Sequence, residues 1–133
     1  MKQKGDLELI EREIKHTIAK GTLVSVILFG SSVNSAKTAK DYDILIITKK
    51  LPKKEWVLAG KIKANLLDKV TKPIDIIFLE EKDLDYSNPL LYEVVQKHKL
   101  LYGKNVISKI KIITNNIHVL FEGGVKVGWQ IAQ

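Results

Sequence analysis

With 133 residues, the chain is long enough for one domain that buries about two-thirds of its unfolded surface. It contains no cysteine, which excludes disulfides, thiol catalysis and cysteine-bound metals. The net charge of +7 comes almost wholly from lysine, since Arg12 is the only arginine, and it favours polyanionic partners or simply keeps the protein dissolved. The N-terminus lacks an apolar signal core and no apolar run approaches membrane-spanning length, so a cytoplasmic protein without membrane contact is expected.

The first predicted element is an amphipathic helix over residues 7–20. Asp6 can cap its start, and Gly21 suits its end. Its apolar side chains share one face and are expected to pack on a sheet: Leu7, Ile10, Ile14 and Ile18.

A buried strand and a turn follow this helix. Residues 22–29 form a nearly continuous apolar, β-branched run, which is typical of an interior strand covered on both faces. Gly30 and Ser31 end the run, and glycine lets the backbone turn tightly and approach a ligand closely. Residues 32–39 could form a short helix whose N-terminal amides face an anion. A glycine-serine pair alone is only a turn in most proteins, so its weight comes from its position at a strand end.

Two aspartates open the next strand, which is predicted over residues 41–48. Strand residues two apart share a face, so Asp41 and Asp43 project side by side. A third acid, Asp75, lies within the strand predicted over residues 73–79. Aspartate is disfavoured in strands, and two carboxylates about 5 Å apart repel by about 3 kcal/mol at an effective dielectric of about 20. Hard cations such as Mg²⁺ reverse that repulsion, so the three acids are candidate metal ligands. The alternative, a helix cap at Asp41 and a solvated charge at Asp43, is weakened by the turn before them and by Asp75.

Two further helices and a short strand complete the predicted domain. The first helix, over residues 53–70, carries its apolar side chains in one stripe: Trp56, Ala59, Ile62, Leu66 and Val70. Trp56 is therefore predicted to lie in the core rather than to stack on a base. A helix over residues 89–98 starts after Asn88, and a strand over residues 99–102 follows it.

The last 30 residues give a weaker pattern. Val106, Ile110, Ile113 and Ile117 fit a helix, but their β-branched character suits strands equally well, whereas residues 125–131 alternate as a strand does. Covering a sheet edge, pairing with another subunit and loose packing all stay open for this tail.

One stretch resembles a known signature. The Gly30-Ser31 pair, a nine-residue gap and Asp41-Tyr42-Asp43 resemble the glycine-serine and Asp-x-Asp motifs of the nucleotidyltransferase superfamily with the DNA polymerase beta fold. The small size looks like the minimal nucleotidyltransferases (MNT) of HEPN/MNT toxin–antitoxin modules, and the likeness covers about residues 5–103. The chain departs from that pattern in a gap one residue shorter and in the run Ser32-Val33-Asn34-Ser35, where the family usually has a basic, glycine-containing run.

The resemblance implies an α/β fold, a small mixed sheet with helices mainly on one face, of the polymerase beta-like palm type. It implies a nucleotidyltransferase domain over residues 1–103. The extension over residues 104–133 lies outside the resemblance, and we expect it to pack on the same domain. The implied activity is Mg²⁺-dependent transfer of a nucleoside monophosphate, by default AMP from ATP, to a hydroxyl acceptor such as a tyrosine of a partner protein. Two Mg²⁺ ions would bind the first two acids, and the third acid would complete the second metal site and help to deprotonate the acceptor. The residues implied for metal binding and catalysis are Asp41, Asp43 and Asp75, and those implied for binding the triphosphate are Gly30, Ser31 and Ser32.

Other functions stay open beside this one. The main alternative is an antitoxin-like binding module that neutralises a HEPN-type toxin mainly by contact, with weak or no catalysis. Transfer to a small hydroxylated molecule, as in antibiotic-modifying relatives, and assembly into a homo-oligomer are further options. A nucleic-acid binder would show salt-dependent binding that ignores the three acids, and it is disfavoured because no interleaved aromatic and basic stripe occurs.

Overall fold

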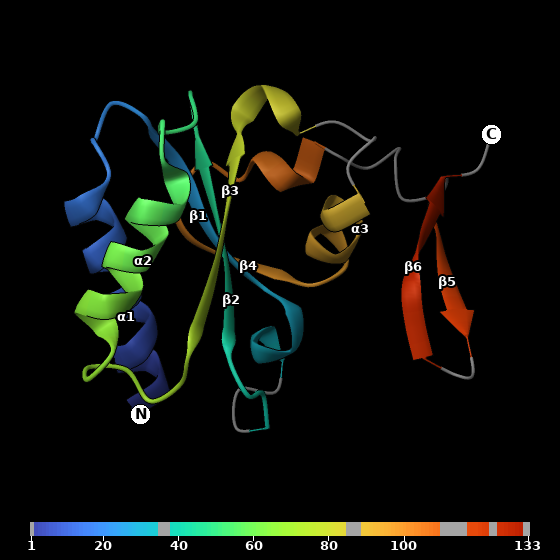
Figure 1. Ribbon diagram of the computed structural model, residues 1–133, viewed down its shortest axis with the longest axis horizontal. Coiled ribbons are helices and arrows are strands. Elements are labelled where there is room, and N and C mark those ends of the chain that lie inside the picture. The colour runs from blue at the N-terminus through green and yellow to red at the C-terminus, as the bar shows by residue number, and fades with distance from the viewer. Residues whose placement is uncertain (1, 35–37, 85–88, 110–116, 123–124, 132–133) are drawn as a thin grey trace.

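The computed structural model describes residues 2–34, 38–84, 89–109, 117–122 and 125–131. Its helices are α1 (Lys2–Thr17), α2 (Glu55–Leu66) and α3 (Pro89–Gln96), with short 3-10 turns η1 (Gly30–Val33), η2 (Glu81–Asp83) and η3 (Val106–Lys109). Its strands are β1 (Leu23–Phe29), β2 (Tyr42–Thr48), β3 (Ile74–Glu80), β4 (His98–Gly103), β5 (Ile117–Glu122) and β6 (Val125–Ile131) (Figure 1). None of the helices in this described part has the length and hydropathy that a bilayer span requires.

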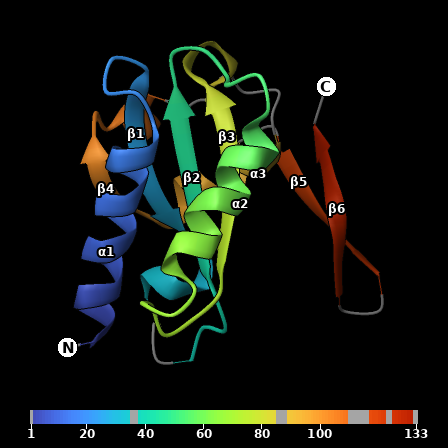
Figure 2. The same ribbon diagram turned by 60° about the vertical axis from the view of Figure 1, so that its left-hand side comes forward.

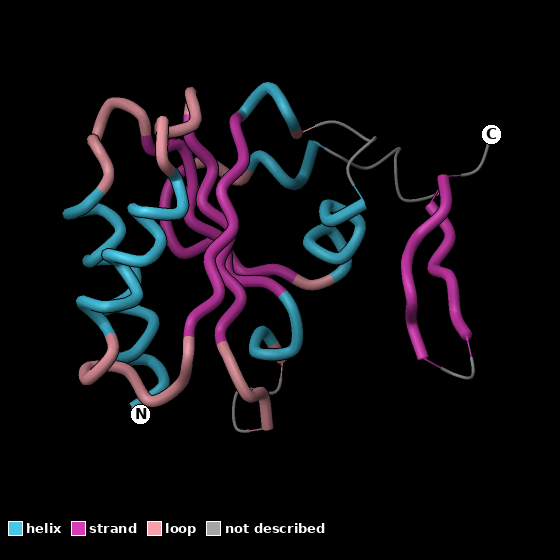
Figure 3. Tube along the Cα trace, viewed as in Figure 1, coloured by secondary structure: helices cyan, strands magenta, loops and turns pink. Residues whose placement is uncertain are grey.

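A four-stranded mixed sheet forms the centre of the fold, in the order β3-β2-β1-β4. Strand β1 runs antiparallel to both β2 and β4, whereas β2 and β3 run parallel. β1 is buried along its whole length, as its apolar run predicts. Because β2 and β3 run parallel to each other and β2 runs antiparallel to β1, both begin at the end of the sheet where β1 ends (Figure 1, and as a tube in Figure 3).

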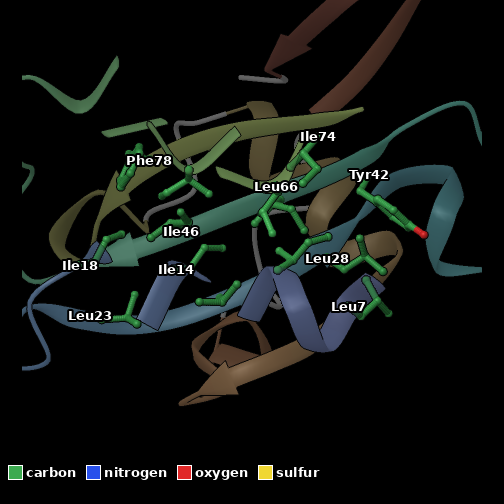
Figure 4. Packing of buried hydrophobic residues seen from close by; sticks show 14 residues of the cluster. Leu7, Ile14, Ile18, Leu23, Leu28, Tyr42, Ile46, Leu66, Ile74 and Phe78 are labelled. Atoms are coloured by element: carbon green, nitrogen blue, oxygen red, sulfur yellow. The ribbon is translucent and has the colours of Figure 1, made fainter. Parts of the chain in front are cut away.

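Helices cover both faces of this sheet unequally. In Figures 1 and 2, α1 and α2 lie together on one face, and α3 lies on the other. The larger apolar cluster packs α1 and α2 against Leu28, Tyr42 and Ile46 (Figure 4). The opposite cluster packs α3 against residues such as Leu45. The predicted α/β fold, with a mixed sheet and helices mainly on one face, is therefore confirmed.

Helix α1 differs from its prediction at the N-terminal end. It begins at Lys2, so Asp6 lies inside the helix and the predicted cap at Asp6 is wrong. The Asp6 carboxylate is buried and accepts hydrogen bonds from the Tyr42 hydroxyl, at 2.8 Å, and from the backbone N–H of Thr71, at 3.1 Å. The predicted apolar face is confirmed, because all four of its side chains are buried: Leu7, Ile10, Ile14 and Ile18.

Helix α2 is shorter than predicted, and the predicted core position of Trp56 is wrong. The Trp56 side chain is 67% exposed rather than in the core. Ile62 and Leu66, both buried, define the inward face of α2. At 3.6 residues per turn Trp56 projects about 100° away from that face, because spacings of three residues drift around a helix.

The tail contains a β-hairpin. Strands β5 and β6 pair antiparallel in a second, two-stranded sheet, so the strand predicted over residues 125–131 is confirmed. Val106 lies in η3, whereas Ile110 and Ile113, which fitted a helix, lie outside the described residues. The division into a domain over residues 1–103 and an extension packed on it stays a prediction.

Candidate active site

The turn after β1 brings the backbone against an acid of β2. Gly30 has a φ of +79°, a conformation that side-chain-bearing residues rarely adopt. Phe29 pairs with Asp43 across the β1–β2 ladder, so Gly30 follows directly beside that aspartate. A Cβ added to Gly30 would lie 2.6 Å from Oδ2 of Asp43. Only glycine therefore fits at position 30 while the carboxylate keeps its place.

Three carboxylates meet at this end of the sheet. Asp43 and Asp75 are direct partners in the parallel β2–β3 register, and Asp41 immediately precedes β2. One carboxylate oxygen from each of the three lies within 4.8 Å of the others. Asp41 and Asp43 are half-buried, whereas Asp75, on the outermost strand, is exposed. We call these three residues the acid cluster.

The electrostatics of the acid cluster show that its charges are not neutralised by the protein. Burial raises the pKa of Asp43, and the neighbouring charges of Asp41 and Asp75 raise it further, to about 6. The described residues place no ion pair on this carboxylate. A cation would remove the repulsion that the fold maintains here.

The donor set fits Mg²⁺. Carboxylate oxygens are the hard ligands that this ion prefers, at about 2.1 Å, so two oxygens on opposite sides of one ion lie about 4 Å apart. The separations within the acid cluster, none above 4.8 Å, are of this order. The same spacing suits two ions about 4 Å apart that share a carboxylate.

The two serines of the turn lie in different environments. Ser31 is exposed beside the acid cluster, whereas Ser32 is 2% exposed. The Ser32 hydroxyl has no hydrogen-bond partner among the described residues. Only η1 represents the short helix predicted over residues 32–39, since residues 35–37 lie outside the described part. Triphosphate binding by Gly30, Ser31 and Ser32 stays a prediction.

The sequence analysis did not identify a hydrogen-bonded group that lies behind the acid cluster, on the opposite face of the sheet. Tyr42, the residue between Asp41 and Asp43, is fully buried on the opposite face, and its hydroxyl donates to Asp6. Burial alone would raise the pKa of Asp6, but hydrogen bonds from Thr71 and Tyr42 and the charge of Lys72 outweigh it and lower that pKa. Burial and the Asp6 carboxylate raise the pKa of Tyr42 to about 12, so the hydroxyl remains a donor. The signal for this group was a buried aspartate within the apolar face of a helix, which requires a partner.

Fold and acid cluster together define a domain of the polymerase beta-like nucleotidyltransferase class. The matching family model is described as Polymerase beta, Nucleotidyltransferase, and it matches residues 12–107, a segment that includes the turn and all three acids. The chain belongs to this family.

Solved structures show the same fold. A complex of a tri-AMPylated Shewanella oneidensis HEPN toxin with its MNT antitoxin matches with 24% identity and a TM-score of 0.54, over 82% of this chain and 78% of that chain. A toxin–antitoxin structure with AMP-PNP matches with 23% identity and a TM-score of 0.55, over 82% and 81%. Spectinomycin adenyltransferase from Enterococcus faecialis, with ATP and spectinomycin, matches with 16% identity and a TM-score of 0.64, over 83% and 60%. No curated protein sequence matches the chain significantly.

Proposed function

We propose that this protein transfers AMP from ATP, with Mg²⁺, to a hydroxyl group on a partner protein, such as a tyrosine. The observation that carries the proposal is the acid cluster, three carboxylates within 4.8 Å of one another beside a glycine turn, in a chain of the nucleotidyltransferase family. The acceptor oxygen attacks the α-phosphorus of ATP, the bond from that phosphorus to the bridging oxygen breaks, and pyrophosphate leaves. Asp75, exposed at the outer edge of the sheet, takes up the proton that the attacking hydroxyl group loses.

Asp41 and Asp43 hold Mg²⁺ in this proposal, and Asp75 completes a second metal site. Two bound ions supply positive charge that stabilises the attacking and leaving oxygens of an in-line displacement. Gly30 brings the backbone of the turn close enough to donate an N–H to the triphosphate, and the exposed Ser31 hydroxyl can donate as well. The unpaired Ser32 hydroxyl is a further donor at the same turn.

A protein acceptor is favoured by what the similar structures contain. The complex named for a tri-AMPylated HEPN toxin and the structure with AMP-PNP share 24% and 23% identity with this chain, against 16% for the spectinomycin enzyme. A HEPN-type protein is therefore the partner class that we propose. A triphosphate substrate is also in keeping with the cytoplasmic location expected from the sequence.

A second candidate function is neutralisation of such a partner by contact, with weak or no transfer. The observation that favours it lies in the turn, because residues 32–36 contain no lysine or arginine to bind a triphosphate. In that case the acid cluster would be present without a productive nucleotide site.

Calorimetric titration of ATP with Mg²⁺ tests the enzymatic proposal. The wild type should bind ATP only when Mg²⁺ is present, and an Asp41→Asn/Asp43→Asn variant should not bind. Glu81→Gln/Asp83→Asn is the matched control, because it removes the same charge from two exposed residues of η2. Failure of folded wild type to bind ATP with Mg²⁺ would refute a stand-alone transferase, and equal loss in the control would show that net charge, not the acid cluster, matters.

A further inference from the structure

Large apolar side chains are exposed mainly along one border of the molecule. Where burial is described, four such residues are exposed: Trp56 at 67%, Val57 at 53%, Leu67 at 75% and Ile77 at 36%. Three of them, all except Val57, line hollows beside β3. Exposed apolar residues that gather in this way mark an interaction surface more often than scattered ones do.

Two hollows run along this border. One, of about 360 Å³, lies at the end of α2 and contains Leu67, Lys63 and Asp75 in its lining. The other, of about 420 Å³, is lined by Trp56, Lys63 and Ile77 among others. Lys63 lines both hollows, and Asp75 joins the first to the acid cluster. We call this continuous surface the edge strip: Trp56, Lys63, Leu67 and Ile77, with Asp75 at its end.

The edge strip borders a strand that pairs on one side only. β3 is the outer strand of the four-stranded sheet in the described structure, and α2 lies in front of β2 and β3 in Figure 2. The outward N–H and C=O groups of an edge strand offer hydrogen bonds to an added segment. From Trp56 to Leu67 the helix rises by about 17 Å, which an extended segment of about five residues spans.

The charge around the edge strip defines what it can bind. Residues 53–72 contain six lysines and two acids. The exposed Lys63 side chain lines both hollows, whereas the Lys72 ammonium is buried 5.6 Å from the centre of the Tyr42 ring and acts on the Asp6 carboxylate. Apolar contacts beside an exposed lysine, in a part of the chain rich in lysine, suit a segment that combines apolar and acidic side chains.

We propose that the edge strip docks the acceptor segment of the partner protein, an acidic and apolar stretch that lies along β3. This proposal rests on the proposed function, since it places the acceptor hydroxyl at Asp75. The apolar side chains of the segment cover Trp56, Leu67 and Ile77, while its carboxylates face Lys63. Continuity of the edge strip with Asp75 is what distinguishes an acceptor site from an unrelated contact surface.

A synthetic 12-residue peptide tests the docking directly. The peptide alternates glutamate and leucine and ends in one tyrosine, and its control carries lysine in place of glutamate. Because the chain has two tryptophans, Trp129→Phe leaves Trp56 as the only tryptophan reporter. The acidic peptide should shift the Trp56 emission, and the lysine peptide should not.

Variants in α2 and at its C-terminal cap locate the binding surface. Leu67→Asp and Lys63→Glu should each weaken binding of the acidic peptide at least tenfold. Val57→Asp is the matched control for Leu67→Asp, since it introduces the same charge at an exposed apolar residue of α2 that lines neither hollow. Equal weakening by Val57→Asp, equal binding of the lysine peptide, or self-association of the wild type that buries Trp56 would overturn the proposal.

Calorimetry with Mg²⁺ and ATP on the same samples separates the two proposals. Binding of ATP without any peptide-induced change at Trp56 refutes the docking and leaves the transferase standing. Peptide binding without ATP binding refutes the transferase and leaves the docking surface standing. Transfer of labelled AMP to the peptide tyrosine, lost in Leu67→Asp but kept in Val57→Asp, supports both.

Discussion

Asp43→Asn should stabilise the protein when no divalent metal is present. A rise in the pKa of Asp43 from 3.8 to about 6 corresponds to about 3 kcal/mol of unfavourable interaction for the charged carboxylate. Asp43 is only half-buried, so solvent screening reduces this to about 1–2 kcal/mol. The folded state holds its proton more tightly than the unfolded state, so wild-type stability falls as pH rises from about 4 to about 6. Asparagine cannot ionise and removes that loss.

Urea unfolding followed by circular dichroism measures this effect. In EDTA at pH 7.5 the variant should be about 1–2 kcal/mol more stable than the wild type, and at pH 4 the difference should shrink toward zero. Added Mg²⁺ should stabilise the wild type and not the variant, because only the wild type binds the ion. Asp83→Asn, at an exposed residue of η2, should change stability by less than about 0.5 kcal/mol. A variant that is less stable than the wild type in EDTA at pH 7.5 would refute the claim that the acids repel each other in the folded protein.

Three further predictions concern the same end of the sheet. Gly30→Ala should cost about 1–3 kcal/mol and abolish Mg²⁺-dependent ATP binding, because its methyl group would lie 2.6 Å from the Asp43 carboxylate at a φ of +79°. The control Gly60→Ala, an exposed helical position with nothing within 4 Å, should instead stabilise by about 0.5–1 kcal/mol in the same unfolding assay. Tyr42→Phe should cost about 1–3 kcal/mol in urea unfolding, since it removes a donor from the buried Asp6 carboxylate, and an unchanged midpoint would contradict that hydrogen bond. Affinity for Mg²⁺ in calorimetry should fall about tenfold per pH unit below pH 6, because Asp43 must lose its proton to bind, and a flat profile from pH 5 to 7.5 would contradict that role.

The strands and the acids could be predicted because their signals are local. A continuous apolar run produced the fully buried β1, and a spacing of two placed Asp41 and Asp43 on one face of the chain. The parallel register that pairs Asp43 with Asp75 is a long-range property, and no local pattern specifies it. The sequence therefore predicted the members of the acid cluster, and only the structure showed how close they lie.

The wrong predictions share a cause, which is that tertiary partners decided the outcome. Asp6 has the residue type of a helix cap, but its hydrogen-bond partner Tyr42 is 36 residues away and Thr71 is 65 residues away. Trp56 fitted one edge of the predicted apolar stripe of α2. In the described structure the sheet ends at β3, so no strand covers the Trp56 side chain. Ser32 showed no signal that would distinguish its buried hydroxyl from the exposed one of Ser31.

Transfer and neutralisation by contact place different demands on the acid cluster and on the edge strip. Transfer needs the acid cluster and the edge strip together, whereas contact needs only a surface that binds the partner. Asp43→Asn disables the acid cluster and leaves Trp56 and Leu67 in place. Leu67→Asp alters the edge strip and replaces no proposed metal ligand. In cells that express a HEPN-type toxin, rescue of growth that survives Asp43→Asn but not Leu67→Asp would mean neutralisation by contact. Rescue lost with either substitution would mean that the docked partner must also be modified.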